Sequence, residues 1–263
     1  MENEIKSDEQ PINSGQQSTQ EKEEKVMPFL DHLEELRSRM LKSIVVLFVT
    51  TIVCYFFSPD IVAFLTKPYP DKLIFLAPQE SFIVHIKISL FAGLFLSLPV
   101  IFYQLWQFVV PGLLEKERKY VPLIVFFSTA FFLLGSSFCY YVIIPFGLKF
   151  LLGWQTENLQ PSVAIREYLK FVTMLVLVFG IVFELPLLSF FLSKMGMLTP
   201  QFLRRNRRYG IVITFIIAAI LTPPDVVTQL LLAGPLLLLY EVSIWVSYFI
   251  TKKNVKASEE SDT

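Results

Sequence analysis

The fold is decided by one uncharged stretch, residues 121–145, which reads VPLIVFFSTAFFLLGSSFCYYVIIP. As an α-helix, this stretch would extend about 37 Å, because each residue adds about 1.5 Å along the axis. About 20 apolar residues are enough to cross the hydrocarbon core of a bilayer. The stretch therefore predicts a helix that spans a membrane.

Five other apolar runs of the chain are long enough, or nearly so, to cross a bilayer in the same way. The chain is therefore predicted to be an all-α integral membrane protein with six transmembrane helices and both termini on one side. The fifth run is the shortest, because the Thr-Pro-Pro-Asp break at 222–225 stops it, and it makes a tight hairpin with the sixth. The predicted spans are about 41–57, 83–103, 121–145, 167–192, 209–222 and 226–249.

The composition agrees with a chain whose solvent is partly lipid. Apolar residues make up 54% of the 263 residues, and Phe alone occurs 26 times, which exceeds what one soluble core of this size needs. Residues 1–26 are polar and are predicted to form a disordered cytoplasmic tail. Residues 27–250 form the six-span membrane domain, and 251–263 form a cytoplasmic C-terminal tail. The acidic N-terminal tail is unlike an organelle transit peptide, which favours a bacterial plasma membrane.

The distribution of Lys and Arg predicts the orientation of the spans. Residues 1–42, 104–120, 193–208 and 251–263 together hold seventeen of these residues, whereas the loops on the other side hold four. Cytoplasmic loops carry the excess of positive charge. Both termini are therefore predicted to be cytoplasmic, and the proline-rich loop 58–82 is predicted to form a kinked outer cap.

The residues that enzymes use for catalysis are sparse and scattered. The two histidines, His32 and His85, are far apart, and no nucleophile motif or phosphate-binding glycine loop accompanies them. Cys54 and Cys139 lie inside apolar runs, where a thiol behaves as a small hydrophobe. The sequence therefore predicts no enzymatic activity, metal site, disulfide or cofactor, and no nucleic-acid partner.

Two segments on the predicted cytoplasmic side carry more chemistry than a membrane anchor needs. The first, HLEELRSR at 32–39, has an apolar face and a charged face, and Glu35 and Arg39 are spaced to pair on one helix surface. The second, YQLWQFVVPGLLEKER at 103–118, combines aromatic rings, a helix-breaking Pro-Gly and mixed charges. An amphipathic lead-in helix and an interfacial aromatic anchor would each explain one segment without any further role.

Acidic residues also fall within the predicted spans. Glu184 in span four and Glu241 in span six are at similar predicted depths, and an ionised carboxylate at a helix centre costs roughly 2.5–3.5 kcal/mol. Both are predicted to face protein or water, or to be protonated. A polar network between spans is the structural alternative. Asp225 is predicted to cap the sixth span.

Taken together, these segments resemble the TatC family, the multi-span subunit of twin-arginine protein translocases. The resemblance rests on HLEELRSR at 32–39, LPVIFYQLWQFVVPGLLEKER at 98–118, FELP at 183–186 and TPPDVVTQLLLAGPLLLLYE at 222–241, in the family's order. It implies a cup-shaped bundle that binds the signal peptides of folded cargo proteins. It also implies transport powered by the proton gradient, in a larger complex with TatA- and TatB-type single-span subunits.

The resemblance further implies roles for particular residues of this sequence. Glu35 and Glu117 occupy the positions whose carboxylates receive the paired arginines, because guanidinium and carboxylate form bidentate hydrogen bonds that lysine cannot reproduce. Phe108 lies beside them, and Arg37 belongs to the same binding segment. Glu184 is implied to be an intramembrane acid on the concave face, and spans five and six are implied to be short and to dock the partner subunits. The remaining implied positions are Gln229 and Glu241 at that docking edge, and Pro68 and Asp225 in the outer cap and loop.

A secondary transporter or channel is the main alternative. In it Glu184 and Glu241 would carry protons or cations. No inverted repeat of interrupted helices is visible in the sequence, and the two cytoplasmic acidic segments would have no role. Signal-peptide recognition accounts for more of the chain.

Overall fold

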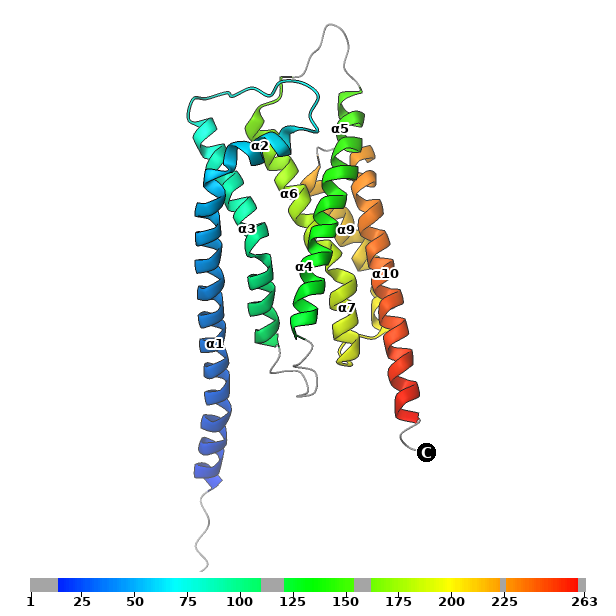
Figure 1. Cartoon of the computed structure of the whole chain (residues 1–263). Coiled ribbons are helices and arrows are strands. Elements are labelled where there is room, and N and C mark those ends of the chain that lie inside the picture. Colours follow the sequence, from blue (N-terminus) through cyan, green and yellow to red (C-terminus); the bar gives the residue numbers. More distant parts are fainter. Residues whose placement is uncertain (1–13, 110–120, 154–161, 223–225, 260–263) are drawn as a thin grey trace, which may run out of the picture.

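The computed structural model describes residues 14–109, 121–153, 162–222 and 226–259, and over these residues the chain forms a bundle of helices that run side by side (Figure 1). The bounds of the helices are α1 Ser14–Phe56, α2 Ser58–Thr66, α3 Glu80–Val109, α4 Val121–Phe138, a π-helix Cys139–Ile143, α5 Ile144–Leu152, α6 Ile165–Phe183, α7 Leu185–Lys194, α8 Pro200–Arg205, α9 Arg207–Leu221 and α10 Val226–Glu259.

Five stretches of these helices are long and apolar enough to cross a membrane. They are His32–Phe56, Glu80–Phe108, Val121–Leu152, Ile165–Lys194 and Val226–Lys252, and they agree with predicted spans one to four and six. Predicted span five is α9, whose 15 residues would extend only about 22 Å. The prediction that the chain crosses the membrane six times rests on this short helix and stays a prediction.

The two ends of the bundle differ in what they carry. α1 begins and α10 ends at the lower end in Figure 1, whereas α2 and the loop that follows it lie at the upper end. This placement agrees with an even number of crossings. We call the end with α2 and the loop before α3 the cap end, and the end with the start of α1 the tail end.

Helices reach further into the predicted tails than expected. α1 begins at Ser14, inside the 1–26 segment that was expected to lack structure, and residues 1–13 lie outside the described residues. α10 continues to Glu259 without a break. The expectation of a short sixth span is therefore wrong, because the helix has 34 residues. The 251–259 segment holds three Lys and one Glu, which are good helix formers and let the helix continue past its apolar part.

The helices pack in an order that places the first and last spans on opposite sides of the bundle. α1 packs on α3, α3 on α4, and α4 on α6, while α7 and α9 both pack on α10. At the contact of α1 with α3, the backbone of Gly93 lies against Thr51, and the Thr50 hydroxyl donates to the Gly93 carbonyl at 2.9 Å. A side chain at position 93 would collide with this backbone, so glycine lets the two helices approach closely.

The cap end is held together by a buried acid. Glu80, the first residue of α3, is only 5% exposed. Its carboxylate accepts the Leu76 N–H at 2.7 Å and the Arg166 N–H at 3.3 Å. Ile74 and Ala164 form a parallel bridge beside it. Glu80 therefore ties the loop before α3 to the first turn of α6.

Two of the spans are not regular α-helices throughout. The π-helix Cys139–Ile143 lies between α4 and α5 and ends two residues before Pro145. α6 ends at Phe183 and α7 begins at Leu185, so predicted span four is interrupted at Glu184. Pro186 has no N–H to give to the Val182 carbonyl, and the Glu184 N–H bonds to the Ile181 carbonyl at 3.1 Å.

Candidate functional site

A network of polar side chains joins α1 to α3 at the tail end of the bundle. Arg39 donates from Nε to the Glu35 carboxylate at 2.9 Å and makes a second, shorter bond to the same oxygen. Its other terminal nitrogen donates to Gln107 Oε1 at 2.7 Å, and Gln107 in turn donates to the Tyr103 hydroxyl at 2.8 Å. The pairing of Glu35 with Arg39 that the helical spacing predicts is therefore present, and it is anchored on α3.

An aromatic pair lies beside this network. The rings of His32 and Phe108 stack with centroids 4.3 Å apart and planes inclined by 10°. His32 Nδ1 is 3.6 Å from the second carboxylate oxygen of Glu35. The stack fixes Phe108 next to Glu35, so one apolar ring and one carboxylate face the same region of the surface.

The carboxylate of Glu35 keeps room for a further donor. Arg39 occupies one of its oxygens, whereas the other faces His32, and the Glu35 side chain is 33% exposed. A carboxylate has about four acceptor positions, so the oxygen near His32 can accept hydrogen bonds from an arriving cation. Arg39 therefore fixes the position of the Glu35 carboxylate and occupies only one of its two oxygens.

The other two residues predicted for this site stand apart from Glu35 or cannot be placed. Arg37 is exposed, and residues two apart on a helix do not share a face, so the structure does not bring it into the network. Glu117 falls in the 110–120 segment, outside the described residues. The involvement of both residues stays a prediction.

Glu184 lies deep between α4 and the junction of α6 with α7. Its side chain is 7% exposed, and among the described residues its Oε1 has no hydrogen-bond partner. The Ser128 hydroxyl and the Phe132 backbone interact with its carboxyl group, and the buried Trp106 donates to that hydroxyl at 3.1 Å. The prediction that this acid faces protein agrees with this placement.

Glu241 is in a different environment from Glu184. It accepts a hydrogen bond from Arg207, the first residue of α9, and the two side chains are 40% and 51% exposed. Glu241 is therefore paired on the outside of the bundle, whereas Glu184 is buried within it. The matching depth of the two acids in the membrane stays a prediction.

The remaining predicted positions hold parts of the bundle together or cannot be placed. The Gln229 side chain donates to the Phe215 carbonyl at 3.2 Å and so joins α10 to α9. Pro68 is half-buried just after α2, at the cap end. Asp225 lies outside the described residues. Gln229 is therefore partly engaged within the chain.

Sequence reasoning missed His32 and Gln107 as members of the site. Both are visible in hindsight as helix neighbours of predicted residues: His32 precedes Glu35 by three positions, and Gln107 adjoins Phe108. The spacing of residues along one helix does not predict the contact between α1 and α3, because that contact depends on the close approach of the two helices at Gly93. The cap-end clamp at Glu80 was missed as well.

Comparison with known proteins fixes the family. Residues 31–235 match the family model described as Sec-independent protein translocase protein (TatC). The chain belongs to the TatC family. It is 41% identical over 246 residues to the Sec-independent protein translocase protein TatC of Desulforapulum autotrophicum, covering 91% of each chain. It is 41% identical to the TatC of Aquifex aeolicus, with 86% of this chain and 97% of that protein covered.

A solved structure supports the same assignment. The crystal structure of a twin arginine translocase receptor, TatC, superposes with a TM-score of 0.77 at 40% identity, over 84% of this chain and 99% of the other. The resemblance inferred from the sequence motifs is thereby confirmed. This TatC-family chain is a membrane protein of a protein translocase, and its relatives are named as translocase components.

Proposed function

We propose that this TatC-family chain binds the twin-arginine signal peptides of folded cargo proteins at the contact of α1 with α3. The observation that carries the proposal is the prearranged carboxylate of Glu35, held by Arg39 and flanked by the Phe108 ring. A guanidinium binds a carboxylate through two parallel hydrogen bonds, and its flat face stacks on an aromatic ring. Glu35 and Phe108 together offer both surfaces.

Glu117 completes the proposed site as the carboxylate for the second arginine, with Arg37 in the same recognition segment. The segment that carries Glu117 follows directly after α3, the helix that holds Phe108 and Gln107. Two carboxylates match the two charges of an arginine pair.

The wider proposal concerns how the bound cargo is moved. We infer six membrane crossings with both termini in the cytoplasm of a bacterium, because the seventeen Lys and Arg residues gather on that side. TatA- and TatB-type single-span subunits dock at α9 and α10, near Gln229, and copies of the chain associate in a larger complex. The proton gradient supplies the energy, with Glu184 as the buried acid that responds to the partner subunits.

The test is binding of a labelled signal peptide to the purified chain in detergent. Replacing the Arg-Arg pair of the peptide by Lys-Lys, or making Glu35→Gln, is expected to weaken binding at least about tenfold, because charge-assisted bidentate bonds are lost. Glu34→Gln is the matched control, since Glu34 is exposed on another face of the same helix turn. Equal affinity of the Arg-Arg and Lys-Lys peptides for the unsubstituted chain would rule out this site.

A further inference from the structure

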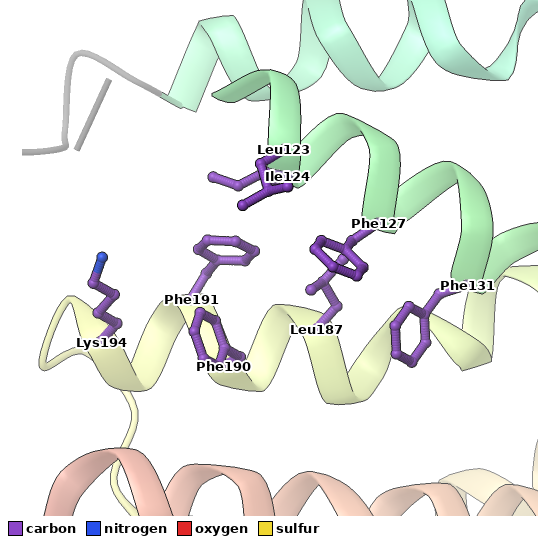
Figure 2. Close-up of a pocket in the computed structure, with 8 residues that line it drawn as sticks. All are labelled: Leu123, Ile124, Phe127, Phe131, Leu187, Phe190, Phe191 and Lys194. Carbon is purple, nitrogen blue, oxygen red and sulfur yellow. The ribbon is translucent and has the colours of Figure 1, made fainter. Parts of the chain in front are cut away.

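A groove opens between α4 and α7 in the half of the bundle nearer the tail end. It has a volume of about 410 Å³ and is lined by apolar side chains from both helices with one lysine at its end (Figure 2). Lys194 is the last residue of α7, at the tail end. The lining residues are Leu123, Ile124, Phe127, Phe131, Leu187, Phe190, Phe191 and Lys194.

The groove exists because span four changes direction. Before the break at Glu184, α6 packs closely on α4, whereas α7 packs mainly on α10. The two walls therefore separate after Glu184, and four phenylalanines face the space between them. An empty apolar space of this size forfeits dispersion contacts on both walls, so an apolar occupant would stabilise the separated position of α7.

We propose that this groove binds one anionic phospholipid, with an acyl chain along the phenylalanines and the phosphate at the Lys194 ammonium. The chain lies in a membrane, so lipid is the solvent at this surface. Lysine near the end of an apolar surface extends its charge toward the headgroup region, where an anionic phosphate complements it.

The lining favours a lipid as the occupant. An acyl chain matches the four phenylalanines, and the anionic phosphate joined to it matches the lysine at the end of the groove.

The structure contains a reporter for this site. Trp106 is buried and its ring lies 4.7 Å from that of Phe191, which lines the groove. A brominated acyl chain in the groove would therefore quench Trp106 fluorescence. With Trp154→Phe and Trp245→Phe, Trp106 is the one remaining tryptophan of the chain.

The experiment places this single-tryptophan chain in mixed micelles with dibrominated phosphatidylglycerol or dibrominated phosphatidylcholine. We expect the anionic lipid to reach half-maximal quenching at about a fivefold lower fraction, the preference that one lysine near a membrane surface provides. Lys194→Gln removes the preference, and Lys194→Arg keeps it. Leu187→Phe narrows the groove and lowers the maximal quenching by both lipids.

Lys170→Gln is the matched control, because Lys170 is an exposed lysine on α6 that does not line the groove. It should leave the preference unchanged. Equal quenching by the two lipids in the unsubstituted chain would overturn the proposal, as would a preference that survives Lys194→Gln or disappears in Lys170→Gln. The outcome does not depend on signal-peptide binding.

Discussion

The buried carboxylate of Glu80 offers a sharp test of how the cap end is held. Glu80→Gln keeps the size of the side chain and removes its charge. In the native chain the carboxylate accepts two backbone N–H groups, from Leu76 and Arg166. Arg166 is in the first turn of α6, and Glu80 itself begins α3, so the charge also meets the positive ends of two helix dipoles.

The magnitude follows from these contacts. A hydrogen bond to a charged group contributes about 1.5–3 kcal/mol, and a neutral one about 1 kcal/mol. The bond to Leu76 is short at 2.7 Å, the bond to Arg166 is long at 3.3 Å, and the glutamine amide can keep only one acceptor oxygen. We therefore expect local opening of the clamp to become easier by about 2–3 kcal/mol, or roughly 30- to 150-fold.

Hydrogen–deuterium exchange measures this opening directly. The amides of Leu76 and Arg166 should lose protection by that factor in Glu80→Gln, while amides in the middle of α10 keep theirs. Glu167→Gln is the control, because Glu167 is 59% exposed and makes only a surface ion pair with Arg166. A change of less than about threefold at both amides, or an equal change in the control, would refute the clamp.

Two further substitutions probe the packing of the helices. Gly93→Val places a Cβ 2.8 Å from the Thr51 Cα, so we expect a loss of about 1–3 kcal/mol in the stability measured by thermal unfolding in detergent, together with weaker signal-peptide binding. Gly234→Ala, which meets no atom within 4 Å, should be neutral or stabilising, and an equal loss there would contradict the steric argument. Glu241→Gln should cost at most about 1 kcal/mol by the same measurement, because its pair with Arg207 is exposed; a larger loss would mean that the pair is buried in the assembled membrane protein.

The length and position of the apolar runs were enough to predict most of the fold. Span three, for example, was predicted over 121–145 and the structure extends it to Leu152. A proline such as Pro145 ordinarily interrupts a helix, because it lacks an N–H. The π-helix Cys139–Ile143 changes the hydrogen-bond register just before this proline and lets the helix continue. No pattern in the residues themselves indicates that change of register.

Within the site, only contacts between residues close together on one helix could be predicted from the sequence. The Glu35–Arg39 pair was predicted because the two residues are four positions apart on one helix, and the structure contains it. The pairing of Glu241 with Arg207 was not predicted, because the two residues lie on different helices and are 34 positions apart in the sequence. Contacts between helices depend on packing at positions such as Gly93, which the apolar pattern leaves open.

The break at Glu184 shows how one short segment can set two features of the bundle. Proline alone does not explain it, because Pro99 and Pro235 lie inside continuous helices. At 183–186 the missing N–H of Pro186 coincides with a Glu184 side chain that turns inward beside Ser128, and the chain interrupts its helix there. The same break directs α7 toward α10 and away from α4, which opens the phenylalanine-lined groove below it. The buried acid and the proposed lipid site therefore have one structural origin, so a substitution that straightens this helix should alter both together.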